Sequence, residues 1–131
     1  MSEFHDTLPG SSIQPVEENS IQNLCHGKEI LTRLRARAFF ALAADQTKAA
    51  PGEYPILVYN SFPYELEREI ECEFMLADQN WKEEFTDFTV WQDGRQIPAQ
   101  VEKERSNLPL DWRKRVVFRA KLAPMQISRF D

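Results

Sequence analysis

The chain has 131 residues, a formal net charge of −5 and an apolar share of 42%. This length suits one compact domain, or a small domain with an appendage, and it is too short for a barrel enzyme of ordinary size. A net acidic chain is a poor candidate for nucleic-acid binding, and a charged share of 28% with 11% aromatic residues argues against disorder. Composition therefore predicts a soluble folded domain, and function has to be sought in local motifs.

The chain is predicted to start with a loop and a long helix. Residues 1–14 are assigned to the loop, because Pro9-Gly10-Ser11-Ser12 has turn chemistry. Pro15 suits the first turn of a helix over 15–46, and acidic residues follow where the helix dipole favours them. A helix of about 30 residues is roughly 45 Å long, which is too long for a small domain to cover. We therefore expect its apolar stripe to need partner helices from outside this chain. The stripe consists of Ile21, Leu24, Leu31, Leu34, Ala38, Ala41 and Leu42.

A change of period marks the second half of the chain. Residues 47–54 are expected to be a linker, since Ala49-Ala50-Pro51-Gly52 breaks the helical pattern. Apolar residues then alternate with polar ones, and Asp93-Gly94 is typical of a tight hairpin turn. The predicted fold class is α+β, with one long N-terminal helix followed by a mainly antiparallel, β-sandwich-like domain over 55–131. Its six expected strands are 56–59, 70–76, 88–91, 97–101, 116–122 and 125–130.

Charge is segregated between two parts of this second half. Acidic residues dominate 65–84 and basic residues dominate 102–121. We expect an acidic strand face to lie beside a basic one and to pair with it across the strands. The run Arg113-Lys114-Arg115 has a second interpretation, contact with phosphate, but no aromatic platform or nucleic-acid motif accompanies it. No nucleic acid is therefore expected as a partner.

The cysteines and the hydropathy pattern indicate a cytoplasmic location without a membrane partner. Cys25 and Cys72 lack a metal-type spacing and are interpreted as small buried apolar residues, with a disulfide or a ligand role as the alternative. A reducing compartment fits this interpretation, and no signal peptide is evident. The longest apolar run, 38–44, is far below the roughly 20 residues that a membrane span needs.

One pair of residues suggests chemistry. His5 and Asp6 are adjacent, imidazole is a common zinc ligand, and carboxylate is a common second ligand or hydrogen-bond acceptor for a substrate. Such a pair is also ordinary in a solvent-facing loop, and zinc takes three or four ligands. His26, on the predicted helix, is interpreted as a surface residue. The tryptophans are interpreted as core or rim residues of a sandwich, with sugar-stacking platforms as the alternative; they are Trp81, Trp91 and Trp112.

A longer context around this pair resembles a known family. Residues 4–13 read FHDTLPGSSI and continue with Pro15, Val16 and Glu17. This stretch resembles a motif late in the catalytic domain of family 38 glycoside hydrolases, the retaining, metal-dependent α-mannosidases. The resemblance covers nearly the whole chain, and the stretch at 4–13 is its most specific part. Further matching stretches are RARA at 35–38, ALAA at 41–44, PILVYNSFP at 55–63 and RVVFRA at 115–120.

The resemblance implies a role for each residue of the pair. His5 matches a zinc-ligand histidine of the family, and Asp6 matches an aspartate that contacts mannose hydroxyls. Thr7 stands where Ile or Ala is more usual. Zinc, or a similar divalent cation, would chelate neighbouring sugar hydroxyls and help to distort the ring. The family's His-x-Asp ligand pair, aspartate nucleophile and acid/base carboxylate have no counterpart in this sequence, and the resemblance places them in an earlier catalytic domain.

The implied identity is a non-catalytic segment of an α-mannosidase, from the end of the catalytic region through the first β-sandwich. Its expected partners are the remainder of the parent chain and, in the parent enzyme, a mannose-containing glycan. No catalytic residue and no bound metal are expected in the isolated segment, and the apolar stripe is expected to favour self-association. The first alternative is a free-standing β-sandwich that binds carbohydrate or protein through aromatic side chains. The second alternative is a structural or oligomerisation domain built on the helix.

Overall fold

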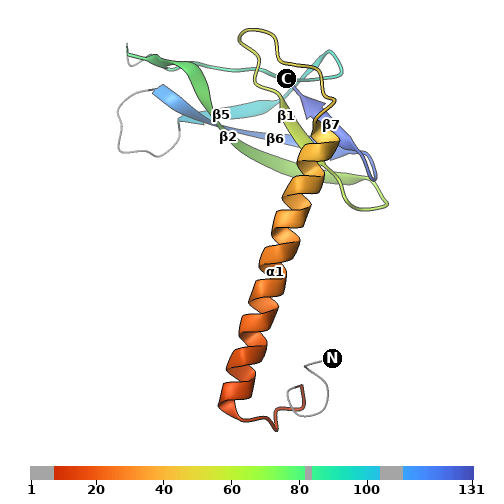
Figure 1. The fold of residues 1–131 in the computed structure, drawn as a ribbon. Helices are drawn as coiled ribbons and strands as arrows, with labels where there is room; N and C mark the ends of the chain where they lie inside the picture. The colour runs from red at the N-terminus through yellow and green to blue at the C-terminus, as the bar shows by residue number, and fades with distance from the viewer. Residues whose placement is uncertain (1–7, 82–83, 104–110) are drawn as a thin grey trace. The chain divides into compact units, whose positions relative to one another are not determined.

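The computed structural model describes residues 8–81, 84–103 and 111–131 (Figure 1). The chain divides into two compact units, Met1–Asp45 and Gln46–Asp131. One long helix followed by antiparallel sheets confirms the predicted α+β class. The first unit contains helix α1 (Gln14–Ala43). The described strands of the second unit are β1 (Ile56–Tyr59), β2 (Leu66–Asn80), β3 (Val90–Gln92), β4 (Arg95–Ile97), β5 (Ala99–Lys103), β6 (Asp111–Leu122) and β7 (Ile127–Phe130).

Helix α1 starts with the first turn that the sequence predicts. The carbonyl of Ile13 accepts hydrogen bonds from the backbone N–H groups of Val16 (3.0 Å) and Glu17 (3.3 Å), and a proline occupies the first turn. The helix ends at Ala43, three residues before the predicted end. Large apolar side chains remain exposed along it, including Leu31 with an exposed fraction of 66%. Within the described part of the first unit, nothing covers the apolar stripe.

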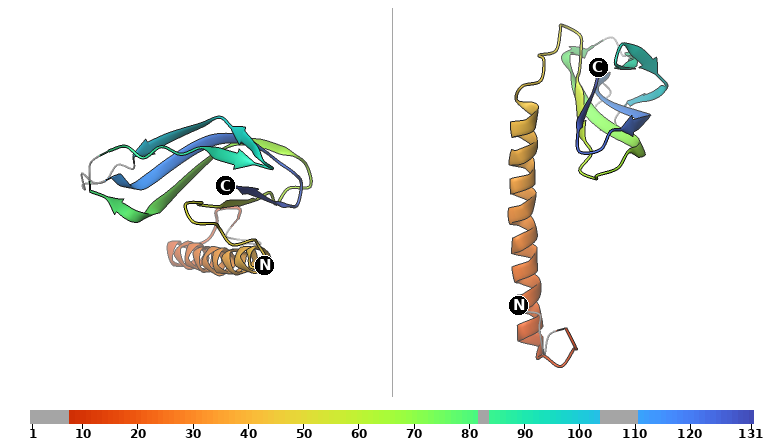
Figure 2. Two further views of the ribbon diagram at one scale, coloured as in Figure 1. Left: turned by 90° about the horizontal axis from the view of Figure 1, so that it is seen from above. Right: turned by 90° about the vertical axis from the view of Figure 1, so that its right-hand side faces the viewer.

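Strand β6 is the centre of the second unit. It pairs antiparallel with both β2 and β5, in the sheet order β2-β6-β5. Its inward side chains form the buried core together with Phe130 of β7 and Val90 of β3, and the rings of Phe118 and Phe130 lie 4.8 Å apart. The β1–β7 pair packs on this inward side of the sheet (Figure 2). Two layers that share one apolar core give the unit its sandwich-like form. The inward residues of β6 in this core are Val116, Phe118, Ala120 and Leu122.

The outer face of the same sheet carries the predicted charge pairing. Arg119 Nε lies 3.0 Å from Glu67 Oε1, and Arg115 Nε lies 2.9 Å from Glu71 Oε1 and 3.9 Å from Glu102 Oε2. Because β6 lies between β2 and β5, Arg115 links both neighbouring strands. The expectation that an acidic strand lies beside a basic one is confirmed. These partly exposed pairs fix the register more than they stabilise the sheet, since each contributes about 0–1 kcal/mol.

The predicted hairpin forms, but its return strand is shorter than expected. Asp93 (φ 50°) and Gly94 (φ 74°) form a two-residue turn between β3 and β4, with Gln92 opposite Arg95. The prediction of one continuous strand over 97–101 is wrong. This stretch is divided at Pro98, so that Ile97 ends β4 while β5 pairs with β6 in another sheet. Proline has no N–H to donate to a ladder, which explains the break.

Strand β2 is longer than the predicted 70–76 and contains an irregularity. Its pairing with β6 shifts register between Met75 and Asn80. Backbone groups inside this bulge find side-chain partners instead of ladder bonds. Trp112 Nε1 donates to the Leu76 carbonyl oxygen (3.1 Å), and the Ala77 N–H donates to the Tyr54 hydroxyl (2.9 Å). The two aromatic side chains therefore allow β2 to continue past the bulge.

A buried asparagine ties the two layers together at the other end of β6. Asn60 has an exposed fraction of 2% and directly follows β1. Its Nδ2 donates to the carbonyl oxygens of Tyr64 (2.9 Å), Leu122 (3.1 Å) and Ala123 (3.1 Å). Its Oδ1 accepts from the Phe62 N–H (3.0 Å). One side chain therefore satisfies the backbone at the β6–β7 turn and at the turn after β1.

Replacing this asparagine tests its structural role. We expect Asn60→Ala to lower the free energy of unfolding by about 2–3 kcal/mol, because several buried backbone groups lose their partner. Urea unfolding followed by tryptophan fluorescence measures the change. Arg119→Ala is the matched comparison, since Arg119 is 69% exposed and its removal is expected to cost less than about 1 kcal/mol. Equal effects of the two substitutions would contradict the role assigned to Asn60.

Candidate functional site

The predicted metal and sugar contacts lie outside the described residues. His5 and Asp6 precede residue 8, so their roles as zinc ligand and mannose contact stay predictions. The chain that follows them is anchored to the start of α1, because the Ser12 hydroxyl donates to Glu17 Oε1 (3.0 Å). Gly10 adopts a positive φ of 80°, which fits the turn expected there. Within the part of the chain that the structure describes, no group of three or more His, Cys, Asp or Glu residues is arranged to hold a metal ion.

A hollow of about 640 Å³ opens in the second unit beside β3. Aromatic rings form much of its wall. The rings of Tyr54 and Phe74 lie 4.8 Å apart, and the ring of Phe88 stands nearly perpendicular to both at 5.7 and 5.2 Å. Trp91, which is 43% exposed, also lines the hollow. The volume lies within the range of small-molecule sites, and the wall offers ring faces to a ligand.

Some of the polar groups that line the hollow already form hydrogen bonds within the protein. The Tyr54 hydroxyl accepts from the Ala77 N–H and keeps its own proton free to donate. The Trp91 indole N–H donates to Thr89 Oγ1 (2.9 Å), so Trp91 offers its ring rather than a donor. The Asp87 carboxylate accepts from the Phe88 N–H (2.9 Å) and is otherwise exposed. This combination of ring faces and oxygen acceptors can receive a ligand with an apolar face and hydroxyl donors.

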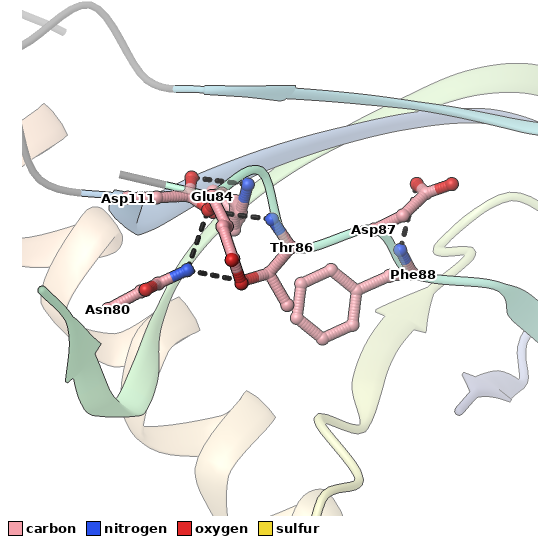
Figure 3. Close-up of polar contacts among 7 residues, drawn as sticks. Asn80, Glu84, Thr86, Asp87, Phe88 and Asp111 are labelled. Atoms are coloured by element: carbon pink, nitrogen blue, oxygen red, sulfur yellow. Dashed lines mark hydrogen bonds and ion pairs between the residues drawn. The ribbon is translucent and has the colours of Figure 1, made fainter. Parts of the chain in front are cut away.

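A buried ion pair lies at the start of β6, and Figure 3 shows its carboxylate, Asp111, facing the backbone of Thr86. Asp111 and Lys114 have exposed fractions of 2% and 0%, and the ammonium contacts Asp111 Oδ1. The Lys114 Nζ also lies 3.7 Å from the centre of the Phe85 ring, which is a cation–π contact. The Thr86 N–H donates to Asp111 Oδ2 (2.6 Å), and Asn80 Nδ2 donates to the Glu84 carbonyl oxygen (2.6 Å). These contacts hold the segment 84–86 against the start of β6 and the end of β2.

The surroundings of Asp111 act on its ionisation in opposite directions. Burial on its own would raise the pKa of the carboxyl, because it disfavours the charged form. Hydrogen bonding by Lys114 and by the backbone and hydroxyl of Thr86 outweighs burial, and the pKa lies below its ordinary value. A lysine reacts as a nucleophile when it is accessible and neutral, whereas Lys114 is enclosed and paired with an anion. The pair therefore has a structural role.

Other sequence interpretations have mixed outcomes. Cys25 is exposed, so its interpretation as a buried residue is wrong; it lies on the uncovered helix. Cys72 is half-buried at an inward position of β2, and burial, followed by the charge of Glu73, raises the pKa of its thiol. His26 is exposed, as predicted. Trp81 is 73% exposed and does not belong to the core.

Sequence reasoning missed the buried pair and most of the hollow. The sequence pattern places Lys114 with its basic neighbours Arg113 and Arg115, yet its side chain occupies the inward phase of the alternation that continues through Val116 and Phe118. A charged residue on an apolar phase is the feature that would have indicated a buried partner. Tyr54 and Phe88 come from segments without regular structure, and no local pattern brings them together.

Compared with protein-family models and with curated proteins, the chain matches none.

Removing the cation tests the buried pair. We expect Lys114→Met to lower the free energy of unfolding at neutral pH by about 3–5 kcal/mol, because Asp111 is left buried without its counter-charge. Chemical denaturation measures the loss. Lys121→Met changes the same residue type at an exposed position of the same strand and is expected to have little effect. A small loss in Lys114→Met, similar to that in Lys121→Met, would show that the pair does not hold 84–86 in place.

The pH dependence of stability tests the direction of the Asp111 shift. A carboxyl with a lowered folded-state pKa stabilises the protein above its unfolded pKa of about 3.9, and this contribution is lost as the pH falls through the folded value. In Lys114→Met, burial dominates and the Asp111 pKa is expected to rise. Acidification then relieves the variant while it weakens the wild type. The stability gap between them should therefore narrow as the pH falls, first above about pH 4, where the carboxyl of the variant becomes protonated, and then below it, where the wild type loses its contribution. A constant or growing gap across this range would contradict this account.

Proposed function

We propose that the chain is a non-catalytic segment of a retaining, metal-dependent α-mannosidase that packs against the catalytic part and helps to complete it. The stretch at 4–13, which carries His5 and Asp6, supplies the resemblance on which the proposal rests. In the parent enzyme His5 would ligate zinc or a similar divalent cation and Asp6 would contact mannose hydroxyls. The segment would contribute these two side chains and a scaffold, while the nucleophile and the acid/base carboxylate come from the remainder of the parent chain.

The exposed apolar surface of α1 is the observation that supports a packing role. Leu24, Leu31 and Leu34 have exposed fractions of 57%, 66% and 53%. Leaving a row of leucines in water costs the free energy that burial would recover, about 25 cal/mol for each Å² of apolar surface. Such a surface marks an interaction site. The helix follows directly after the stretch at 4–13, so a partner that covers α1 would also hold this stretch near the partner's own residues.

A cytoplasmic location completes the proposal. Cys25 and Cys72 are both free thiols, which is usual in a reducing compartment. No described helix is long and apolar enough to cross a membrane.

A free-standing binding module is the second candidate, and the aromatic hollow favours it. Trp91, Tyr54 and Asp87 offer two ring faces and a carboxylate that suit a sugar ring. In this case the chain would bind carbohydrate by itself, without a catalytic half.

The two candidates differ in what the isolated chain does. For the mannosidase segment we expect no turnover of an aryl α-mannoside and no tight zinc binding, because one histidine is too few ligands for zinc. We also expect the reading frame upstream of Met1 to encode a His-x-Asp pair and a nucleophilic aspartate. Turnover of the aryl α-mannoside by the pure chain would refute the proposal that it is a non-catalytic segment. An independent start at Met1, with mannoside binding that Trp91→Ala abolishes and Trp81→Ala leaves intact, would favour the module.

A further inference from the structure

Helix α1 presents a regular seam on one face. Its positions alternate at spacings of three and four residues, which is the heptad pattern of helices that pack side by side. The seam combines three exposed leucines with three small residues, so it offers large side chains to a partner helix and also space to receive the partner's own. Ser20, one step before the seam, is already buried. The seam consists of Leu24, Gly27, Leu31, Leu34, Ala38 and Ala41.

Cations flank this seam, and acids do not. In the heptad frame, Lys28 and Arg35 lie on one edge and Arg37 lies on the other. The acidic residue in the middle of the helix, Glu29, lies on the opposite face and pairs there with Arg33. Flanking charges determine which helix a heptad seam accepts, because they meet the flanks of the partner.

A second copy of the chain fits this seam poorly. In an antiparallel pair, Leu31 packs against Leu34 of the other copy, and the same register sets Lys28 opposite Arg35. In a parallel pair, the three cations meet Asn23, Ile30 and Leu42, so no acid compensates any of them. Self-association through the helix, although expected from the apolar stripe, therefore opposes like charges in one orientation and leaves cations unpaired in the other.

We propose that the seam of α1 binds a helix whose own heptad seam is flanked by aspartate or glutamate, supplied by the catalytic part of the parent enzyme. The inference rests on the proposed function for the source of this helix, and on the described residues for its chemistry. The leucines supply the contact area, and the cations select an acidic partner over a second copy. Lys28 and Arg35 lie two helical turns apart on one edge, so two acids at the same separation on the partner satisfy both.

The chain itself supplies a probe of stated chemistry. The variant Lys28→Glu/Arg35→Glu keeps the seam and converts one flank to acid. In an antiparallel pair of this variant with the wild type, the two new glutamates face Arg35 and Lys28 of the wild-type chain. Sedimentation equilibrium of the mixture should show a heterodimer with a dissociation constant about tenfold or more below that of either protein alone. About 1 M salt should remove most of this preference, because it shortens the screening length to about 3 Å.

Matched variants make the outcome decisive. Gln22→Glu/Ala36→Glu places two acids on the face opposite the seam, and its mixture with the wild type should show no preference. Adding Leu31→Asn to the acidic variant should abolish the heterodimer, while circular dichroism monitors that the helix persists. Wild-type self-association as tight as the mixture, or no heterodimer from helical variants, would overturn the proposal. The proposed function fails separately, if the frame upstream of Met1 encodes no catalytic domain; a charge-selective seam would still stand.

Discussion

The alternation of strand β6 is the constraint on which the second unit depends. Every second side chain, from Val116 to Leu122, enters the core, and the intervening ones carry the charges that pair with β2 and β5. Because side chains on a strand alternate strictly, a shift of one residue would expose the core and bury the charges. Both faces therefore specify the same register. The other layer, β1 and β7, has a single place to pack, where Phe130 meets Phe118.

The elements that were predicted correctly are those whose pattern is local. A period of two identifies β6, a short apolar run identifies β1, and Asp93-Gly94 identifies the hairpin, because these signals lie in neighbouring residues. One error has a local cause, since Pro98 divides the strand expected at 97–101. The other arises from distant residues, because β2 extends past its bulge where Tyr54 and Trp112 satisfy its backbone. Neither Tyr54 nor Trp112 is near the bulge in sequence.

The candidate sites also divide into one that local sequence predicts and others that depend on distant residues. The pair of His5 and Asp6 was found from a contiguous stretch, because a ligand motif is local by nature. The Asp111–Lys114 pair was missed although its members are three residues apart, since what makes it buried is Phe85 and Thr86, some 25 residues earlier in the chain. The hollow likewise combines five separate segments. Composition alone contains no information on which side chains share an environment, so such sites require the fold.

The two units reach stability by different routes. The second has a core of its own, formed by both of its layers. Within its own unit helix α1 buries almost nothing, and Gly27 weakens its middle by about 1 kcal/mol relative to alanine. Most helical stability in proteins comes from packing an apolar face. The surface that stabilises α1 is therefore also the surface that selects its partner. A matching acidic helix would therefore stabilise the first unit by the free energy of its binding, so assembly and the stability of α1 would be linked.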